Sequence, residues 1–388
     1  MTLQCFVALC IQPAINFLYR IRRWGRLPQR GPSLVISNHV HDLDTLAVVV
    51  SLAIDGPQNK PIYAVASRRL FEPGFVAARA PRLAALLRKA NWGGLFRRLS
   101  LLPIEDDLFA RSIASLALAV ERRHGDLTFE STFDERTVTE LGGAVACQPL
   151  SYLRSNRMFV ASQRPISLHR LREPYRSEVI AEMRESVAAD TMRLEQLLRT
   201  GGTLYLTPEG RLSTDGRLGR LRGALDRLRA GAELYVIGIS YDVFLGSRLS
   251  MQWRLTKPAR QDDLALSVKA ARPVNVSQVL SAWLAQRTRP FTAAEALAGV
   301  NSCLEALPSG AFVVPELLRD PAGLITSALA KITRLDGLTR ESNKYRRTRS
   351  CVHPKFRAVP DMIGYQAVFF SETVEALQND ATAERQRV

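Results

Sequence analysis

Short apolar runs alternate with longer amphipathic segments up to about residue 260, and this alternation constrains the fold most. The short runs are rich in β-branched residues and favour strands, whereas the longer segments repeat apolar residues at helical spacing. Strands that alternate with helices are typical of a mostly parallel sheet that is flanked by helices. We therefore expect an α/β fold with a helical C-terminal extension.

The same patterns predict individual elements and domain boundaries. The predicted strands are 33–37, 61–67, 203–207, 234–240 and 251–256, and the predicted helices are 43–53, 81–99, 182–200 and 218–230. Further helices are expected at 276–288, 293–306, 320–335 and 364–378, with an exposed polar connection at 341–358. We interpret 30–259 as one domain with an insertion at about 108–175, and 260–388 as a helical region of unknown role.

The charge balance points to an anionic partner. The chain has 53 Lys plus Arg against 37 Asp plus Glu, a formal net charge of +16. Cations are concentrated at 20–30 and 60–98, where large apolar residues lie between them. This mixture favours an anionic membrane surface, although an ordinary solvated basic face is the simpler alternative. No base-reading or stacking motif indicates nucleic acid.

The N-terminal segment is apolar from Leu3 to Leu18 and then becomes basic. The apolar part is shorter than the roughly 20 residues that cross a bilayer. A signal peptide would carry its positive charge before the apolar run. We therefore expect residues 1–29 to form an interfacial amphipathic helix, attached peripherally or shallowly to the cytoplasmic face of a membrane, with a simple packing helix as the alternative. The 5 scattered cysteines suggest neither zinc nor disulfides and fit a reducing compartment.

The first chemical motif is Asn38-His39-Val40-His41-Asp42-Leu43-Asp44, directly after a predicted strand. On a regular helix, His39 and Asp44 would point roughly 140° apart. They meet only if His39 lies in the strand-to-helix turn and Asp44 in the first helical turn. In that arrangement His39 is a general base, and Asp44 fixes its tautomer and stabilises the imidazolium. The alternative is a turn histidine beside a helix-capping aspartate.

The second motif is Thr207-Pro208-Glu209-Gly210-Arg211-Leu212-Ser213, which follows another predicted strand. Parallel strands end at the same edge of a sheet, so we expect this loop near His39. Gly210 permits close backbone approach, Glu209 supplies a hydrogen-bonding acid and Arg211 a cation for an anionic group.

Together the two blocks resemble the N-H-x4-D and P-E-G motifs of the glycerolipid acyltransferase family, which includes lysophosphatidic acid and glycerol-3-phosphate acyltransferases. The runs ASRRLF, GGLFRRLSLLPIED and YVIGIS occur in the same order as in that family, and the resemblance covers about residues 30–245. It implies an α/β sheet with a hydrophobic acyl tunnel and a basic acceptor pocket. It also implies transfer of a fatty acyl group from acyl-CoA or acyl-carrier protein to a hydroxyl of a lysophospholipid or related lipid.

The resemblance also implies residue roles. His39 would deprotonate the acceptor hydroxyl and Asp44 would orient His39. The substrate-binding residues would be Glu209, Gly210, Arg211 and Ser213. Neither a metal nor a cofactor is implied, since the acyl donor is a co-substrate.

Three departures from the family pattern concern the acceptor. Leu212 stands where the family has arginine, and Arg211 stands one place earlier. The block LLPIEDD ends in the acidic run 105–107 where the family has an arginine for the acceptor phosphate. The stretch 165–170 is a second candidate for that block, and the sequence leaves both open. If the acidic run occupies the place, its carboxylates would repel a phosphate, which favours a neutral acceptor.

Two other classes of function remain as alternatives. A metal-dependent hydrolase would use His39, His41 and Asp42, although Asp42 directly follows His41 and the other histidines, His124, His169 and His353, have poor contexts. A catalytically inert lipid-binding membrane protein is the second alternative, against which the His39 and Asp44 pair argues.

Overall fold

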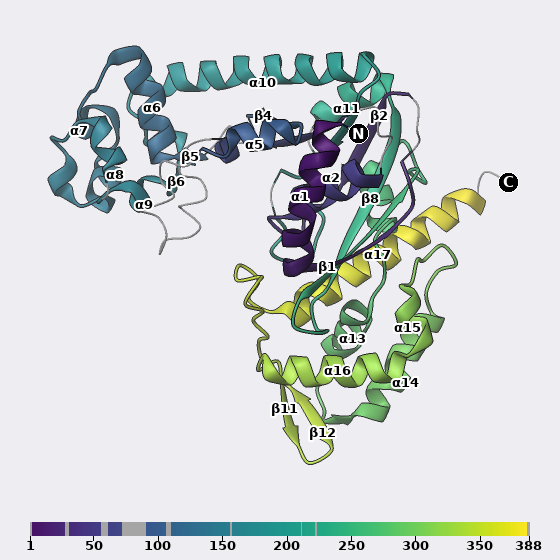
Figure 1. The fold of residues 1–388 in the computed structure, drawn as a ribbon. Helices are drawn as coiled ribbons and strands as arrows, with labels where there is room; N and C mark the ends of the chain where they lie inside the picture. Colours follow the sequence, from purple (N-terminus) through teal and green to yellow (C-terminus); the bar gives the residue numbers. More distant parts are fainter. Residues whose placement is uncertain are drawn as a thin grey trace. The chain divides into compact units, whose positions relative to one another are not determined.

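A seven-stranded, mostly parallel sheet confirms the expected α/β fold (Figure 1). Its strand order is β1-β9-β8-β2-β7-β3-β4. The strands are β1 (Tyr19–Trp24), β2 (Ser33–Ser37), β3 (Ile62–Ser67), β4 (Leu101–Ile104), β7 (Thr203–Leu206), β8 (Glu233–Asp242) and β9 (Leu249–Thr256). β2 pairs in parallel with both β7 and β8, so these three strands end at one edge of the sheet. β9 runs antiparallel to β8 and carries β1 as its parallel neighbour.

The computed structural model describes residues 2–27, 31–55, 61–71, 91–105, 110–155, 157–210, 212–221 and 223–385. The chain divides into two units, Met1–Ile62 with Leu197–Val388, and Tyr63–Gln196. This division differs from domain boundaries at residues 30 and 260, because the N-terminal segment and the C-terminal region share the first unit. Both segments pack against elements of the sheet domain, and the periodicity of a sequence does not predict such long-range packing.

The central strands of the first unit are buried on both faces. Every residue of β2 and β7 is buried, as expected for apolar runs in a parallel sheet covered by helices. The predicted strands 33–37, 203–207, 234–240 and 251–256 therefore match β2, β7, β8 and β9 to within about two residues.

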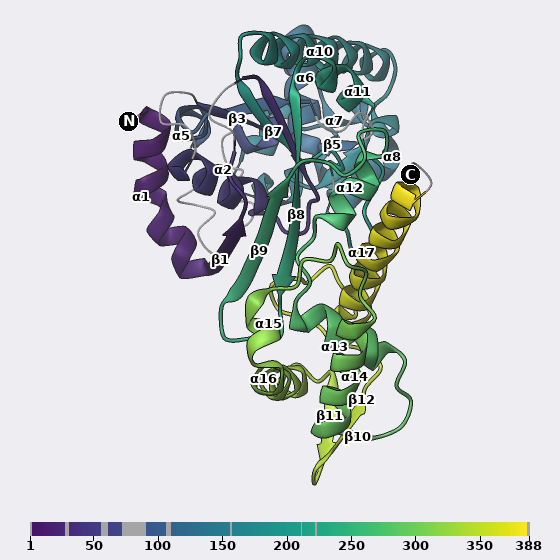
Figure 2. The same cartoon turned by 90° about the vertical axis from the view of Figure 1, so that its right-hand side faces the viewer.

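The C-terminal region belongs to the first unit and does not form a separate layer. Its helices are α12 (Leu264–Ala270), α13 (Val276–Ala285), α14 (Ala293–Glu305), α15 (Pro315–Arg319), α16 (Pro321–Arg334) and α17 (Met362–Arg385). Capping boxes begin α13 at Asn275 and α14 at Thr292, which explains the sharp start of both helices. α17 packs against α12 and α13, and both of these contact β8 (Figure 2).

Two segments near the C-terminus and before β8 differ from the predictions. The polar stretch 341–358 includes part of a hairpin, in which β11 (Leu338–Glu341) pairs with β12 (Lys344–Arg347). β12 also pairs with β10 (Phe291–Thr292), and the ring of Tyr345 stacks on Phe291, which anchors this charged hairpin. The predicted helix 218–230 is reduced to α11 (Ala224–Leu228), because the residues before it form the loop described below.

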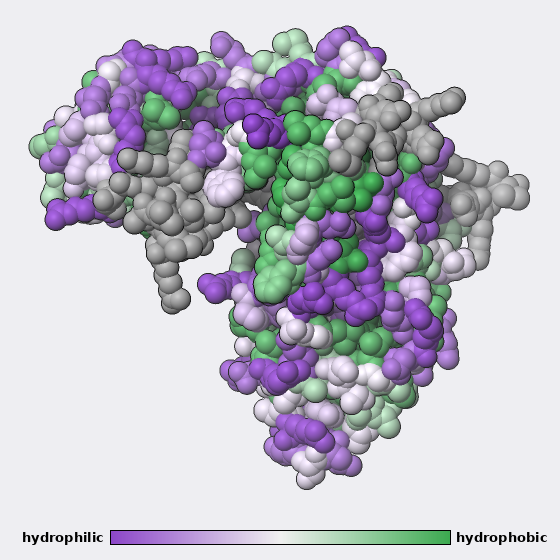
Figure 3. Space-filling model, in the orientation of Figure 1, coloured by the Kyte–Doolittle hydropathy of each residue, from purple (hydrophilic) through white to green (hydrophobic). Residues whose placement is uncertain are grey.

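The N-terminal helix is shorter than the predicted 1–29. α1 (Leu3–Leu18) ends where Tyr19 starts the edge strand β1, whose backbone pairs with β9 from Leu249 onward. α2 (Asp44–Asp55) packs against the buried side of α1. On the other side, hydrophobic side chains are gathered over α1 at the surface (Figure 3). Among the described helices, none combines the length and the apolar character that a membrane crossing requires.

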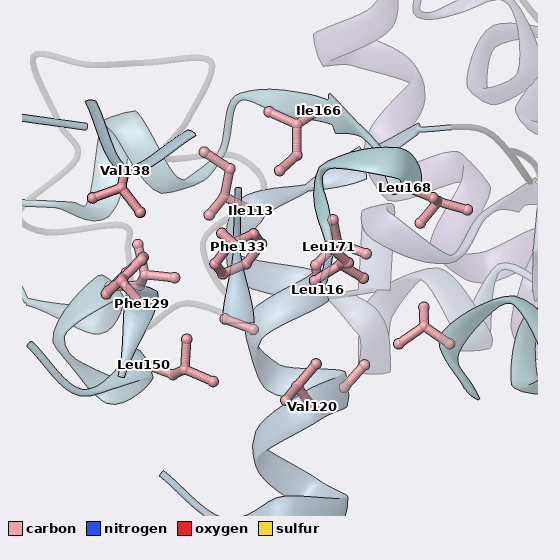
Figure 4. Packing of buried hydrophobic residues seen from close by; sticks show 14 of the residues in the cluster. Ile113, Leu116, Val120, Phe129, Phe133, Val138, Leu150, Ile166, Leu168 and Leu171 are labelled. Atoms are coloured by element: carbon pink, nitrogen blue, oxygen red, sulfur yellow. The ribbon is translucent and has the colours of Figure 1, made fainter. Parts of the chain in front are cut away.

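The second unit holds β3 and β4, which pair in parallel, and a helical part with its own core. Its further elements are η1 (Arg68–Phe71), α5 (Gly93–Arg98), β5 (Ala110–Ser112), α6 (Ile113–His124), β6 (Pro165–Ser167) and α10 (Tyr175–Arg199). Phe129, Phe133 and residues of α6 fill the core of the stretch expected to be an insertion, 108–175 (Figure 4). Residues 81–90 of the predicted basic helix 81–99 lie outside the described residues, and α5 is the described part of it.

Candidate active site

The site begins with Asn38, which ties the end of β2 to β8. Its side-chain nitrogen donates to the carbonyl of Ile239 at 2.9 Å, and its oxygen accepts from the Ile239 amide at 2.7 Å. The amide side chain thus continues the parallel ladder by one more pair after Ser37, while the backbone is free to turn. This is why the chain leaves the sheet at His39.

Asp44 is the centre of the turn. Its Oδ2 accepts hydrogen bonds from the backbone amides of Val40 at 2.6 Å and His41 at 2.7 Å. Asp44 is also the first residue of α2, where the helix dipole favours a negative charge. The side chain is fully buried, so its geometry is fixed by these partners.

His39 lies against this carboxylate, as the spacing predicts for a strand-to-helix turn. Its Nδ1 is 3.4 Å from Oδ2 of Asp44, and its side chain is 18% exposed. Burial lowers the pKa of His39, but the hydrogen bond and charge of Asp44, together with Glu209 and Asp42, outweigh burial and raise the pKa above its ordinary value. With Nδ1 directed at Asp44, Nε2 is the ring nitrogen left to accept a proton.

Two tyrosines complete the hydrogen bonds of this turn. Tyr241, at the end of β8, donates a short hydrogen bond to Oδ1 of Asp44. Tyr19, at the start of β1, lies with its hydroxyl 2.9 Å from Nδ1 of His41. The amide of Leu43 also donates to that nitrogen at 3.4 Å, so Nδ1 of His41 is an acceptor and Tyr19 is the donor.

His41 is therefore neutral and serves to hold the turn. Burial lowers the pKa of His41, more than the charges of Asp44 and Asp42 raise it. Its ring packs edge-on against Phe356, which also contacts His353, and burial lowers the pKa of His353 to about 4. Within the described residues, His353 is thus part of the wall around His41.

Glu209 joins the second motif to the first. Its Oε1 accepts from the backbone amide of His39 at 2.7 Å, and Oε2 accepts from the amide of Gly219 at 2.7 Å. Burial raises the pKa of Glu209, and the two amide donors oppose that rise. The residue that was expected to bind substrate therefore clamps the histidine turn to its own loop through both carboxylate oxygens.

The loop after Glu209 is closed by the C-terminal helix. Gly210 has φ +68°, a left-handed conformation that glycine adopts without strain. Gly216 has φ +86°, and a Cβ there would lie 2.3 Å from the backbone oxygen of Tyr365 in α17. The Oγ of Ser213 accepts from the Gly216 amide at 3.0 Å and bonds Asp215, so Ser213 shapes this loop. Arg211, which stands between Gly210 and Ser213 in the sequence, lies outside the described residues.

A buried charge cluster connects the same loop to α17. Oε2 of Glu372 accepts from the amide of Leu218 at 2.8 Å and from Arg272 at 3.1 Å. Arg272 is 1% exposed and lies 3.9 Å from the ring centroid of Phe369. Sequence reasoning missed this cluster, because its members are far apart in the chain and carry no local motif.

The other predicted positions lie in the second unit. Glu105 is buried and forms an ion pair with Arg111, and the rest of the acidic run lies outside the described residues. The alternative block 165–170 forms β6 and a short 3-10 turn, in which His169 is exposed. Among the described residues, no three His, Cys, Asp or Glu side chains gather as a metal site.

Comparison of the chain with protein-family models and with curated proteins gave no match. The geometry around His39 is therefore the basis for proposing a function.

Proposed function

We propose that the chain is an acyltransferase that moves a fatty acyl group from acyl-CoA or acyl-carrier protein to a hydroxyl of a lysophospholipid or related lipid. The observation that carries this proposal is the pair of His39 and Asp44, whose facing atoms are 3.4 Å apart at the edge of the sheet. A buried carboxylate with four hydrogen-bond partners is a rigid support for an imidazole base.

In this mechanism Nε2 of His39 takes the proton of the acceptor hydroxyl while its oxygen attacks the thioester carbonyl carbon. The carbon–sulfur bond of the resulting tetrahedral intermediate then breaks. The imidazolium returns the proton to the leaving thiolate, so His39 ends neutral, as it began. Asp44 keeps the hydrogen on Nδ1 and stabilises the imidazolium between the two steps.

The remaining hydrogen bonds explain how this pair is kept in position. Tyr241 and the turn amides hold Asp44, and Glu209 holds the backbone amide of His39. α17 closes the loop that carries Glu209 through Glu372. In this proposal the C-terminal helix is thus a structural part of the catalytic unit.

The proposal includes peripheral attachment to an anionic membrane through α1. Leu3, Phe6 and Phe17 are 61%, 53% and 77% exposed, and they follow one another at helical spacing on the outer face of the helix. α1 contains no charged residue, so burying this face in a lipid interface would remove no charge from water.

Arginines that follow α1 in the sequence, and one that contacts its last turn, support the choice of an anionic surface. Arg20 and Arg26 are exposed, and Arg248 donates to the carbonyl of Asn16 in the last turn of α1. Arg22 and Arg23 are less available, because they pair with Glu316 and Asp55. An apolar helix face bordered by arginines is the arrangement that binds anionic lipid interfaces.

The direct test is acyl transfer by the purified chain. Labelled acyl-CoA and acyl-carrier protein would be offered with a panel of lysophospholipids and neutral lipid alcohols, and products separated by chromatography. We expect His39-dependent ester formation with at least one acceptor. Lipid binding without transfer to any acceptor, or transfer that is equal in His39→Ala, would replace this proposal with the inert lipid-binding alternative.

A further inference from the structure

A cavity of about 410 Å³ lies within the second unit, lined by residues of η1, α5, β4, β5, α6 and α10. Pockets of this size commonly hold small organic ligands. Four arginines line it, and the lining contains one acid, Glu182. The arginines are Arg68, Arg97, Arg111 and Arg122.

Two of these arginines are held in place by buried acids. Arg111 forms an ion pair with Glu105. Arg68 donates to Oγ of Ser186 at 2.7 Å and lies 3.2 Å from Oδ2 of Asp190. These two guanidinium groups are already fixed, so they add positive potential to the cavity without losing conformational entropy when an anion binds.

The other two arginines give the cavity its surplus of positive charge. Arg97 and Arg122 are exposed, and no acid in the described part of the chain pairs with them, although Arg97 lies 5.6 Å from the ring centroid of Phe71. Glu182 does not neutralise them, since it lies 3.4 Å from Arg123, outside the lining. In addition, the buried Nε of Arg68 has no hydrogen-bond partner in the described part of the chain.

The cavity also has an apolar component, which comes from the arrangement of α6. Leu116 and Val120 point into the core of the second unit (Figure 4), whereas Leu118 and Arg122 line the cavity. Leu118 is 37% exposed and gives the lining an apolar surface next to Arg122. The lining thus combines guanidinium groups with apolar surface.

We propose that this cavity binds the phosphate group of an amphiphilic ligand, with Arg97 and Arg122 as its principal contacts. Arginine forks match the oxygens of a phosphate, and the apolar lining covers the adjoining chain. Both a lysophospholipid headgroup and the phosphopantetheine of an acyl donor carry this chemistry. The ion pair with Arg111 neutralises Glu105, which is the described residue of the acidic run.

Binding, measured without turnover, tests this site separately from catalysis. Isothermal titration at physiological ionic strength would compare coenzyme A with pantetheine, and a short-chain lysophosphatidate with the monoacylglycerol of the same chain. We expect at least one phosphate-bearing probe to bind at least about tenfold more tightly than its phosphate-free counterpart, since a charge-assisted contact is worth that much. Which probe shows the preference identifies the source of the phosphate.

The variant Arg97→Ala/Arg122→Ala should bind the phosphate-bearing probe about 10- to 100-fold more weakly. Its affinity for the phosphate-free counterpart should be unchanged. Arg184→Ala is the matched control, because Arg184 is an exposed arginine of α10 outside the lining, and its effect should stay below about twofold. The single variant Arg122→Ala repeats the test if the double variant unfolds at a lower temperature. Wild-type protein with no preference for phosphate, or equal losses in the cavity and control variants, overturns the proposal.

Discussion

Tyr241 donates its phenolic hydrogen to Oδ1 of Asp44, while Oδ2 of the same carboxylate faces Nδ1 of His39. Both Tyr241 and Asp44 are buried. Burial raises the pKa of Tyr241 well above its ordinary value, and the charge of Asp44 raises it further. The phenol therefore remains a donor at any physiological pH, and it fixes the carboxylate that orients the proposed base.

Tyr241→Phe removes that donor and little else. A hydrogen bond to a charged group is worth about 1.5–3 kcal/mol. Without it, Asp44 should be less well positioned, and we expect kcat to fall about 10-fold. The KM of both substrates should change less than about threefold, since the residue acts through Asp44. Steady-state kinetics measures both quantities.

Tyr205→Phe is the control for this substitution. Tyr205 is another buried phenol of the sheet, and its hydroxyl bonds Ser37, 2.8 Å away. Its removal should leave kcat within about threefold of wild type. Equal effects of the two substitutions would mean that Tyr241 stabilises the fold without positioning Asp44.

His39→Ala should reduce kcat by about 10³-fold, the usual contribution of a general base, with the circular dichroism spectrum unchanged. Asp44→Asn should cost nearly as much, because an amide favours the wrong tautomer of His39. Single-turnover rates with labelled acyl donor are the measurement. A well-folded His39→Ala protein with near-wild-type turnover would exclude the proposed mechanism.

The raised pKa of His39 predicts how activity depends on pH. The base must be neutral, so kcat/KM should fall as pH decreases through the pKa of His39. Because Asp44 and Glu209 outweigh burial, the midpoint of this fall should lie above 6.5. In the residual activity of Asp44→Asn the midpoint should move to lower pH, since burial then dominates. A midpoint that is unchanged in this variant would assign the ionisation to another group.

Strand ends explain which site residues the sequence could predict. His39, Asp44 and Glu209 each come after a short strand that is buried throughout, so the shared edge of these residues could be predicted from local pattern. Tyr241 meets the same criterion at the end of β8 and was missed, because no motif drew attention to it. The two-oxygen role of Glu209 could not be predicted, since its partners are backbone amides.

Long-range packing explains what the sequence could not show. Arg272 and Glu372 lie 100 positions apart, and neither stands in a pattern that identifies its partner. The end of α1 at Leu18 is likewise set by the pairing of Tyr19 with Leu249, because the basic residues that follow are compatible with a helix or an edge strand. Both features depend on contacts between residues that are far apart in the chain.

Phe6→Ser/Phe17→Ser should weaken attachment to anionic vesicles by at least about 10-fold, since burying one such side chain contributes about 1.5–3 kcal/mol. Flotation with phosphatidylserine-containing and neutral liposomes measures the effect, and added salt should weaken binding to the anionic vesicles. Leu318→Ser is the control, because Leu318 is 63% exposed but lies in α15. If both variants float with vesicles as well as wild type does, α1 is not part of the attachment surface.

Asp242, at the end of β8, allows the burial of this edge of the sheet to be tested without measuring activity. Burial raises its pKa to about 6, against the hydrogen bond from Ser277 and the charge of Arg22. A carboxyl whose folded pKa is raised stabilises the fold most when protonated. This contribution is therefore fully present below about pH 4, its unfolded pKa, and is lost as pH rises through about 6.

Asp242→Asn should abolish this pH dependence, because asparagine does not titrate. Relative to wild type, the free energy of unfolding of the variant should rise by about 2–3 kcal/mol between pH 4 and pH 8. His353, whose pKa is lowered to about 4, acts in the opposite direction, stabilising above pH 6.5 and less as pH falls through 4. It is present in both proteins, so its contribution cancels from their difference. Urea denaturation at several pH values gives that difference directly, and a difference that stays constant with pH would show that the pKa of Asp242 is the same in the folded and the unfolded chain.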